Sequence, residues 1–127
     1  KMKAILFFLV LTLTSCGSIE YGKATGSGSF DTGYTDTKIK KNTYLVKFQG
    51  NGHNSPDNVY LSFLRRGAEI ATEHSYPFFV VTKDQSGSMK NGPVVWPYHQ
   101  GNVKLTKSES EESFNASEIL EKYKNKN

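Results

Sequence analysis

The sequence predicts a small α+β domain in two layers, with a β-hairpin followed by a helix, a strand, a further strand and a short C-terminal helix. Three observations carry this prediction. Residues 33–50 hold two extended arms around a turn, residues 56–74 repeat apolar residues at helical spacing, and residues 78–81 form a continuous apolar run. A chain of 127 residues has room for one domain of this kind.

The hairpin is predicted from an alternating pattern. Tyr44, Val46 and Phe48 occupy every second position of the second arm, which is typical of a half-buried strand, and their common face is expected to point into the core. Between the arms, Asn42 is suited to the left-handed backbone conformation that a tight turn requires.

The helix has a clear start signal. Ser55 is expected to cap it, and Pro56 fits the first helical position, where its missing N–H costs nothing. Gly67 stands in its middle, which predicts a close approach to the sheet because glycine is otherwise unfavourable there. The apolar residues at spacings of three and four are Val59, Tyr60, Phe63, Leu64, Ala68, Ile70 and Ala71.

The second half of the chain is less regular. Residues 78–81 predict a strand that is covered on both faces, and residues 85–93 a loop. Residues 94–96 are ambiguous and favour at most a short strand that ends at Pro97. A last strand is expected to point Val103 and Leu105 inward, and Asn115 to cap the final helix. The predicted core consists of Tyr44, Val46, Phe48, Phe63, Leu64, Phe79, Val81 and Leu105.

The N-terminus has the pattern of an export signal. Lys1 and Lys3 are positive and residues 4–13 are apolar. This run is too short to span a bilayer, which takes about 20 apolar residues, but it fits the apolar region of a secretory signal. The single cysteine of the chain, Cys16, follows it.

The sequence Leu13-Thr14-Ser15-Cys16 resembles the lipobox of bacterial lipoprotein precursors. The resemblance implies that Cys16 carries a diacylglycerol thioether, becomes the first residue after cleavage and is then N-acylated, for example with palmitate. Several acyl chains would hold the protein durably, because each buried CH₂ contributes about 0.8 kcal/mol. Gly17 is not the aspartate that favours inner-membrane retention, which implies the outer membrane. The alternatives are an uncleaved anchor helix or an ordinary signal with a coincidental cysteine.

These motifs divide the chain into three parts. Residues 1–15 are predicted to be a lipoprotein signal peptide, residues 16–32 the acylated cysteine with a flexible Gly/Ser/Thr-rich tether, and residues 33–127 the single α+β domain.

The core region, residues 33–82, resembles a family of small uncharacterised bacterial envelope lipoproteins. The resemblance supports the lipoprotein interpretation but brings no established activity or catalytic residues. Ser75 stands where that family usually has glycine, and the segment between residues 82 and 103 shows no clear match. The residues that carry it are Gly33-Tyr34, the runs 44–52 and 64–69, Glu73-His74 and the run 76–81.

The charge pattern argues against a nucleic-acid surface. The formal net charge is +4, and two of the positive charges are Lys1 and Lys3. The rest of the chain is nearly neutral and shows no cluster of basic and aromatic residues, so no nucleic-acid partner is expected.

No catalytic, cofactor or metal site is predicted. His53, His74 and His99 share no helical spacing, and the chain has no second cysteine to serve as a ligand. A serine and a histidine could in principle meet Asp36, Asp57 or Asp84, but Ser86-Gly87-Ser88 does not form the strand-to-helix turn of a hydrolase nucleophile.

The paired arginines of the predicted helix allow two interpretations. Arg65 and Arg66 could form surface ion pairs with Glu69. Alternatively, Arg66 and Glu69 could lie partly buried beside the Gly-Asn-Gly loop and set its shape, which the sequence favours slightly.

Two functions are compatible with these features. The first is a lipid-anchored, non-enzymatic structural or interaction module at the bacterial outer membrane. Its expected partners are the membrane, through the lipid on Cys16, and an envelope protein. The alternative is a periplasmic ligand-binding protein or enzyme, with a site near His53 and the Trp96–His99 loop, because aromatic and polar residues together can line a pocket. A deep pocket joining those two loops would favour the alternative.

Overall fold

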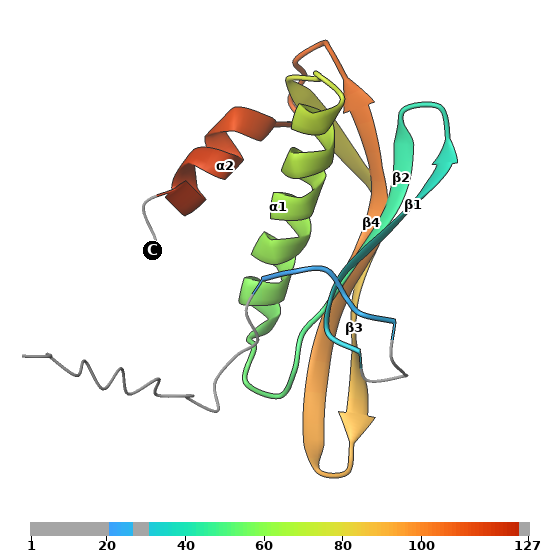
Figure 1. The fold of residues 1–127 in the computed structure, drawn as a ribbon, viewed down its shortest axis with the longest axis vertical. Coiled ribbons are helices and arrows are strands. Elements are labelled where there is room, and N and C mark those ends of the chain that lie inside the picture. Colours follow the sequence, from blue (N-terminus) through green and yellow to red (C-terminus); the bar gives the residue numbers. More distant parts are fainter. Residues whose placement is uncertain (1–20, 27–30, 125–127) are drawn as a thin grey trace, which may run out of the picture.

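The computed structural model describes residues 21–26 and 31–124. In this part of the chain a five-stranded antiparallel sheet carries two helices on one face (Figure 1). The strand order is β1-β2-β4-β3-β5, so the sheet is built around the long β4. The predicted α+β class is confirmed. In chain order the elements are β1 (Gly33–Lys40), β2 (Thr43–Gln49), α1 (Pro56–Glu73), β3 (Phe78–Asn91), β4 (Val94–Thr106), β5 (Ser113–Asn115) and α2 (Ala116–Lys124).

The predicted hairpin is formed by β1 and β2. Asn42 takes a φ of 58° in the turn, as the sequence predicts. Val46 and Phe48 are buried beneath α1, whereas Leu45, the residue before Val46, is 41% exposed on the opposite face. The alternation therefore separates a covered face of the sheet from an open one.

Helix α1 begins as predicted. The side chain of Ser55 accepts a hydrogen bond from the Asn58 N–H at 3.1 Å, and Pro56 follows in the first turn. Gly67 faces Phe79 of β3, and a Cβ at position 67 would lie 2.8 Å from the Phe79 ring. The glycine thus allows the helix to lie directly against the core ring, which confirms the predicted close approach.

The segment predicted to be a loop, residues 85–93, belongs instead to a long β-hairpin. β3 runs to Asn91, and β4 starts at Val94 and continues through Pro97. The Pro97 carbonyl accepts a hydrogen bond from the Gly50 N–H, so it points toward the β2 side. The nitrogen of the same residue faces that side too and has no hydrogen to donate. β2 ends at Gln49, so no ladder partner is lost there, and proline is tolerated in the strand.

The prediction that residues 78–81 are covered on both faces is wrong. Phe79 is completely buried under α1, but its neighbours Phe78 and Val80 are only half-buried. Both described helices lie on one side of the sheet, so alternate residues of β3 point to an uncovered face. Six of the eight residues that the sequence predicts for the core are buried in it, and the other two, Tyr44 and Val81, are partly buried and pack against it. The buried apolar core is Val46, Phe48, Val59, Phe63, Leu64, Ala68, Ile70, Ala71, Phe79, Val103, Leu105 and Ala116.

The last described element, α2, is a capped helix. Asn115 accepts a hydrogen bond from the Glu118 N–H at 3.1 Å, which confirms the predicted cap of α2. The hydroxyl of Tyr123 donates to the Leu61 carbonyl at 3.1 Å and joins α2 to α1.

Among the described residues, neither helix combines the length and apolar character needed to cross a bilayer. The motif from Leu13 to Cys16 lies outside the described residues.

Candidate functional site

Three side chains form a hydrogen-bonded chain in the middle of the β3–β4 hairpin. His99 of β4 lies with its Nδ1 2.9 Å from the Ser86 Oγ and its Nε2 3.0 Å from the Asp84 Oδ2. The carboxylate can only accept, so in neutral imidazole Nε2 donates to Asp84 and Nδ1 accepts from the Ser86 hydroxyl. These are the three residue types of a serine-hydrolase triad.

Strand register and a bulge assemble this chain. Ser86 and His99 are direct partners across β3 and β4, and the register shifts between Thr82 and Gln85. Within the bulge Lys83 has a φ of 51°, and this irregularity turns Asp84 toward the histidine. Gly101 makes room for it, because a Cβ there would lie 2.7 Å from the Asp84 Cβ.

Aromatic rings enclose the histidine. His99 is 5% exposed and lies between Tyr60 and Phe63 of α1, at centroid distances of 4.9 and 4.7 Å. Burial, followed by the nearby charge of Asp84, raises the pKa of Tyr60. The imidazole is therefore held rigidly, and its two hydrogen bonds satisfy both ring nitrogens in a mostly apolar setting.

The sequence allows an aspartate, a serine and a histidine to meet, but its spacing does not select Asp84, Ser86 and His99. Ser86 lies within β3 and not at a strand-to-helix turn. The signal that could have found the cluster is the alternation of β4, which places His99 on the same face as Val103 and opposite Ser86.

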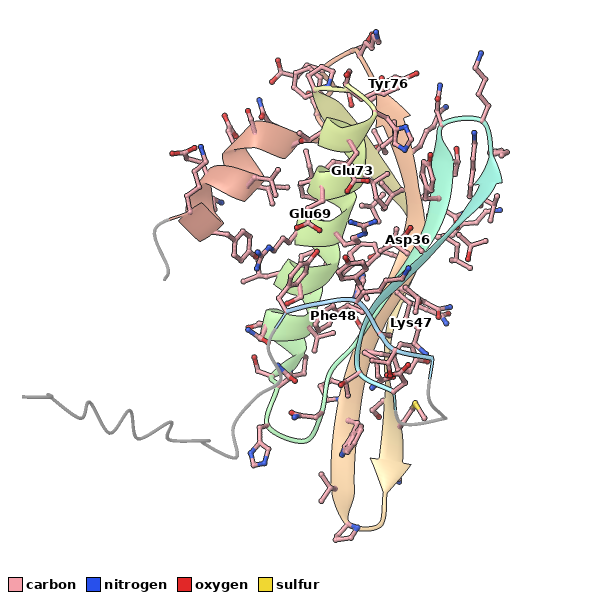
Figure 2. The ribbon with its side chains drawn as sticks, in the orientation of Figure 1. Asp36, Lys47, Phe48, Glu69, Glu73 and Tyr76 are labelled. Carbon is pink, nitrogen blue, oxygen red and sulfur yellow. The ribbon has the colours of Figure 1, made fainter. Side chains whose placement is uncertain are left out.

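A second polar cluster joins α1 to the edge strand β1. The Nε of Arg66 lies 2.7 Å from the Asp36 Oδ2, and its Nη1 lies 3.3 Å from Glu69 and 3.4 Å from Glu73. Figure 2 labels the three carboxylates in this part of the molecule. Burial alone would lower the pKa of Arg66, but the hydrogen bonds to Asp36 and Glu69 raise it, so the guanidinium stays charged.

This cluster corrects the interpretation that the sequence favours slightly. Arg66 is partly buried, with a side chain that is 13% exposed, but its partner on the sheet is Asp36 and not the Gly-Asn-Gly loop. The guanidinium also lies 4.3 Å above the Tyr34 ring. The cluster therefore fixes β1 against the helix, and the loop is shaped by other contacts.

Residues 21–26 belong to the segment predicted to be a flexible tether, yet they pack on the domain. The Tyr34 N–H donates to the Gly22 carbonyl and the Ala24 N–H to the Tyr34 carbonyl, each at 2.9 Å, so this segment adds to the edge of β1. Residues 21–26 of the predicted tether thus belong to the folded domain.

Tyr21 anchors this added segment. Its ring stacks on Phe48 at 5.9 Å, and its hydroxyl donates to Glu69. The guanidinium of Arg65 lies 3.9 Å above the same ring. Burial and the hydrogen bond to Glu69 raise the pKa of Tyr21 far above its usual range.

The loop at residues 50–55 is held by its own amides. The Asn54 Oδ1 accepts from the Asn51 N–H at 2.9 Å, and the Gln49 Nε2 donates to the carbonyls of Gly50, Trp96 and Pro97. The Gln49 Oε1 is buried without a hydrogen-bond partner in the described structure. These contacts explain why the loop is ordered around Asn54, which is 8% exposed.

The alternative site is predicted near His53 and residues 96–99, as a pocket between two loops. The two regions meet by direct packing: a Cβ on Gly52 would lie 2.3 Å from the Val94 Cγ1 and 3.6 Å from the Trp96 Nε1. Residues 96–99 are strand and not loop, so Trp96 and His99 project from opposite faces of the sheet. His53 is exposed, and its backbone N–H donates to the Asn51 side chain.

Within residues 21–26 and 31–124, no cluster of three or more His, Cys, Asp or Glu side chains is arranged to hold a metal ion. Comparisons with protein-family models, with curated proteins and with solved structures give no match for this chain.

Proposed function

We propose that this chain is a lipid-anchored lipoprotein of the bacterial cell envelope, held at the outer membrane through acylated Cys16, and that it serves as a non-enzymatic structural or interaction module. The lipobox supports the anchor. The observation that carries the module is the one-sided sheet, whose helices cover one face and leave the other open (Figure 1).

The open face has the character of a contact surface. Across β1, β2 and β4, Leu45 is paired with Thr37 on one side and Asn102 on the other. Two positions along, Lys47 is paired with Thr35 and Gln100. These side chains are neutral apart from Lys47, which lies 4.7 Å from the Tyr98 ring centroid. A broad face of hydroxyl, amide and aromatic groups around an exposed leucine suits a polar partner surface.

The polar clusters on the other side are compatible with a structural role. Arg66 and Tyr21 direct their charged and hydroxyl groups at residues of the same domain, and His99 is closed off by Tyr60 and Phe63. Their interactions hold the fold together and leave recognition to the open face.

The experiment has one arm for the anchor and one for the partner. Cys16→Ala should abolish incorporation of a radioactive fatty acid, and equal labelling of variant and parent would refute the anchor. For the partner, a photo-crosslinking amino acid at position 45 in intact cells should give one discrete adduct. The matched control is position 61, because Leu61 of α1 is similarly exposed, at 49% against 41%. The same adducts from both positions would refute the open face as the contact surface.

A second candidate function is hydrolysis by Ser86, and the hydrogen-bond chain from Asp84 through His99 favours it. In that role His99 would take the Ser86 proton as the hydroxyl attacks a carbonyl, and Asp84 would stabilise the resulting imidazolium. A fluorophosphonate probe tests this function directly. Labelling that Ser86→Ala and His99→Gln both abolish, but Ser88→Ala does not, would establish the hydrolase; no labelling would leave the module.

A further inference from the structure

The β3–β4 hairpin ends in an apolar tip that projects from the domain (Figure 1). β2 stops at Gln49, whose partner is Tyr98, so from Tyr98 to Val94 the hairpin runs on without β2 beside it. The Gly52 loop packs against one side of this part, at Val94 and Trp96, and Trp96 is half-buried. At about 3.4 Å per residue this projection measures about 14 Å. Val94 is 43% exposed and Val95 49% exposed, although both belong to a residue type that is usually buried.

The chemistry of this tip is that of a membrane interface. Between Asp84 and Glu109 the sequence contains no acidic residue, and Lys90 is the single charge of the tip. Trp96 is the only tryptophan of the protein and stands beside the two valines. Tryptophan is enriched at the boundary between headgroups and acyl chains, and aliphatic neighbours add to the burial there.

The opposite end of the sheet is acidic, whereas the tip is apolar. The loop that follows β4 carries the exposed residues Glu109, Glu111 and Glu112, and it lies at the end of the sheet opposite the β3–β4 turn (Figure 1). Bringing three carboxylates against a phospholipid surface would cost desolvation and, on an anionic leaflet, repulsion. The end with the apolar tip is therefore the one that suits a membrane.

The docked N-terminal segment keeps the domain close to its anchor. Tyr21 packs on Phe48, and in the sequence Tyr21 follows Cys16 by five positions. Five extended residues from Cys16 to Tyr21 reach about 17 Å. From the register partner of Phe48, which is His99, to Val94 the strand also measures about 17 Å. An anchor at the membrane surface thus allows the tip to reach the same plane.

We infer that the β3–β4 tip, with Val94, Val95 and Trp96, inserts into the phospholipid headgroup region of the membrane that holds the lipid on Cys16. The contact turns a one-point lipid anchor into a two-point attachment and fixes the orientation of the domain. The inference rests on the proposed function for its anchor, but its test does not require the cell to acylate the protein.

The unique thiol and the unique tryptophan make this test direct. A chain that begins at Cys16 retains every residue of the described core and couples through Cys16 to a maleimide phospholipid in phosphatidylcholine vesicles. Trp96 emission should then shift to shorter wavelength, and acyl-chain-brominated lipids should quench it. Val94→Asp combined with Val95→Asp should abolish both effects, and the milder Val94→Ser with Val95→Ser should reduce them.

The matched control is Leu61→Asp, because Leu61 has the same 49% exposure as Val95 but lies on α1. It should leave the quenching unchanged. A Gly/Ser insertion of about 10 residues after Gly17 should weaken the quenching, since a longer flexible tether lowers the effective concentration of the tip at the surface.

Three results would overturn the inference: Trp96 emission that does not respond to coupling, equal effects of the Leu61 and valine variants, or equal quenching with the longer tether. An unresponsive tip would instead assign Val94 and Val95 to a protein partner. Because coupling is chemical, failure of fatty-acid labelling in cells refutes only the proposed anchor, and failure of quenching refutes only the tip. Unchanged melting curves of the variants would verify that they remain folded.

Discussion

The Nε of Arg66 in the middle of α1 lies 2.7 Å from the Oδ2 of Asp36 on β1, across 30 residues of sequence. β1 is an edge strand with only β2 beside it in the sheet. The ion pair adds a contact from the helix side and holds the edge strand where Tyr21 and residues 22–24 attach to it.

Asp36→Ala should lower the free energy of unfolding by about 1–3 kcal/mol, because it leaves a largely buried guanidinium without its nearest acceptor. The measurement is chemical denaturation at neutral pH. The control is Glu121→Ala, which removes an exposed pair with Lys124 whose side chains are 66% and 73% exposed. Such a pair contributes at most about 0.5 kcal/mol. Equal losses in both variants would contradict the structural role of Arg66.

Tyr21 should make the protein sensitive to alkali. Its folded pKa is raised by burial and by the hydrogen bond to Glu69, so the folded state retains a proton that the unfolded state releases near pH 10. The stabilisation is therefore fully present below pH 10 and is lost as the pH rises further. The melting temperature should fall more steeply above pH 10 in the parent than in Tyr21→Phe, and parallel curves would contradict the raised pKa.

Three substitutions at the Asp84–His99 hydrogen bond should differ in how much they lower the free energy of unfolding. Asp84→Ala leaves the buried Nε2–H without its acceptor and should cost about 1–3 kcal/mol, whereas Asp84→Asn keeps an acceptor and should cost less. His99→Phe should be nearly neutral, because an aromatic ring refills the space between Tyr60 and Phe63 and leaves no buried polar atom. A large loss in His99→Phe alone would show that the hydrogen bonds outweigh the packing.

Phe63 tests the phase of the helix. Its side chain is completely buried, so Phe63→Ala should destabilise the domain by about 3–5 kcal/mol in thermal or chemical unfolding. The control two residues away is Leu61→Ala, which is half exposed and should change stability by no more than about 0.5 kcal/mol. Similar losses at both positions would mean that the covered face of α1 is assigned wrongly.

Local sequence signals predicted the elements that depend on nearby residues. The cap at Ser55, the left-handed Asn42 and the inward face of β2 each follow from interactions within a few positions, and the structure confirms them. The prediction for residues 85–93 failed because glycine, serine and proline there favour a loop locally. Pairing along β4 overrides that preference, and Pro93 falls in the turn between Asn91 and Val94, where it interrupts no strand.

The candidate sites also differ in whether nearby or distant residues form them. The lipobox at Cys16 and the capped helix are linear patterns, so short stretches of sequence suffice to predict the anchor and the face of α1 that packs. The contacts of Asp84 with His99 and of Tyr21 with Glu69, across 48 residues, arise only when the chain folds. The same holds for the face of the sheet that neither described helix covers. Such contacts depend on strand register, on the bulge in β3 and on which face the helices cover, and these are properties of the packed chain rather than of any short segment.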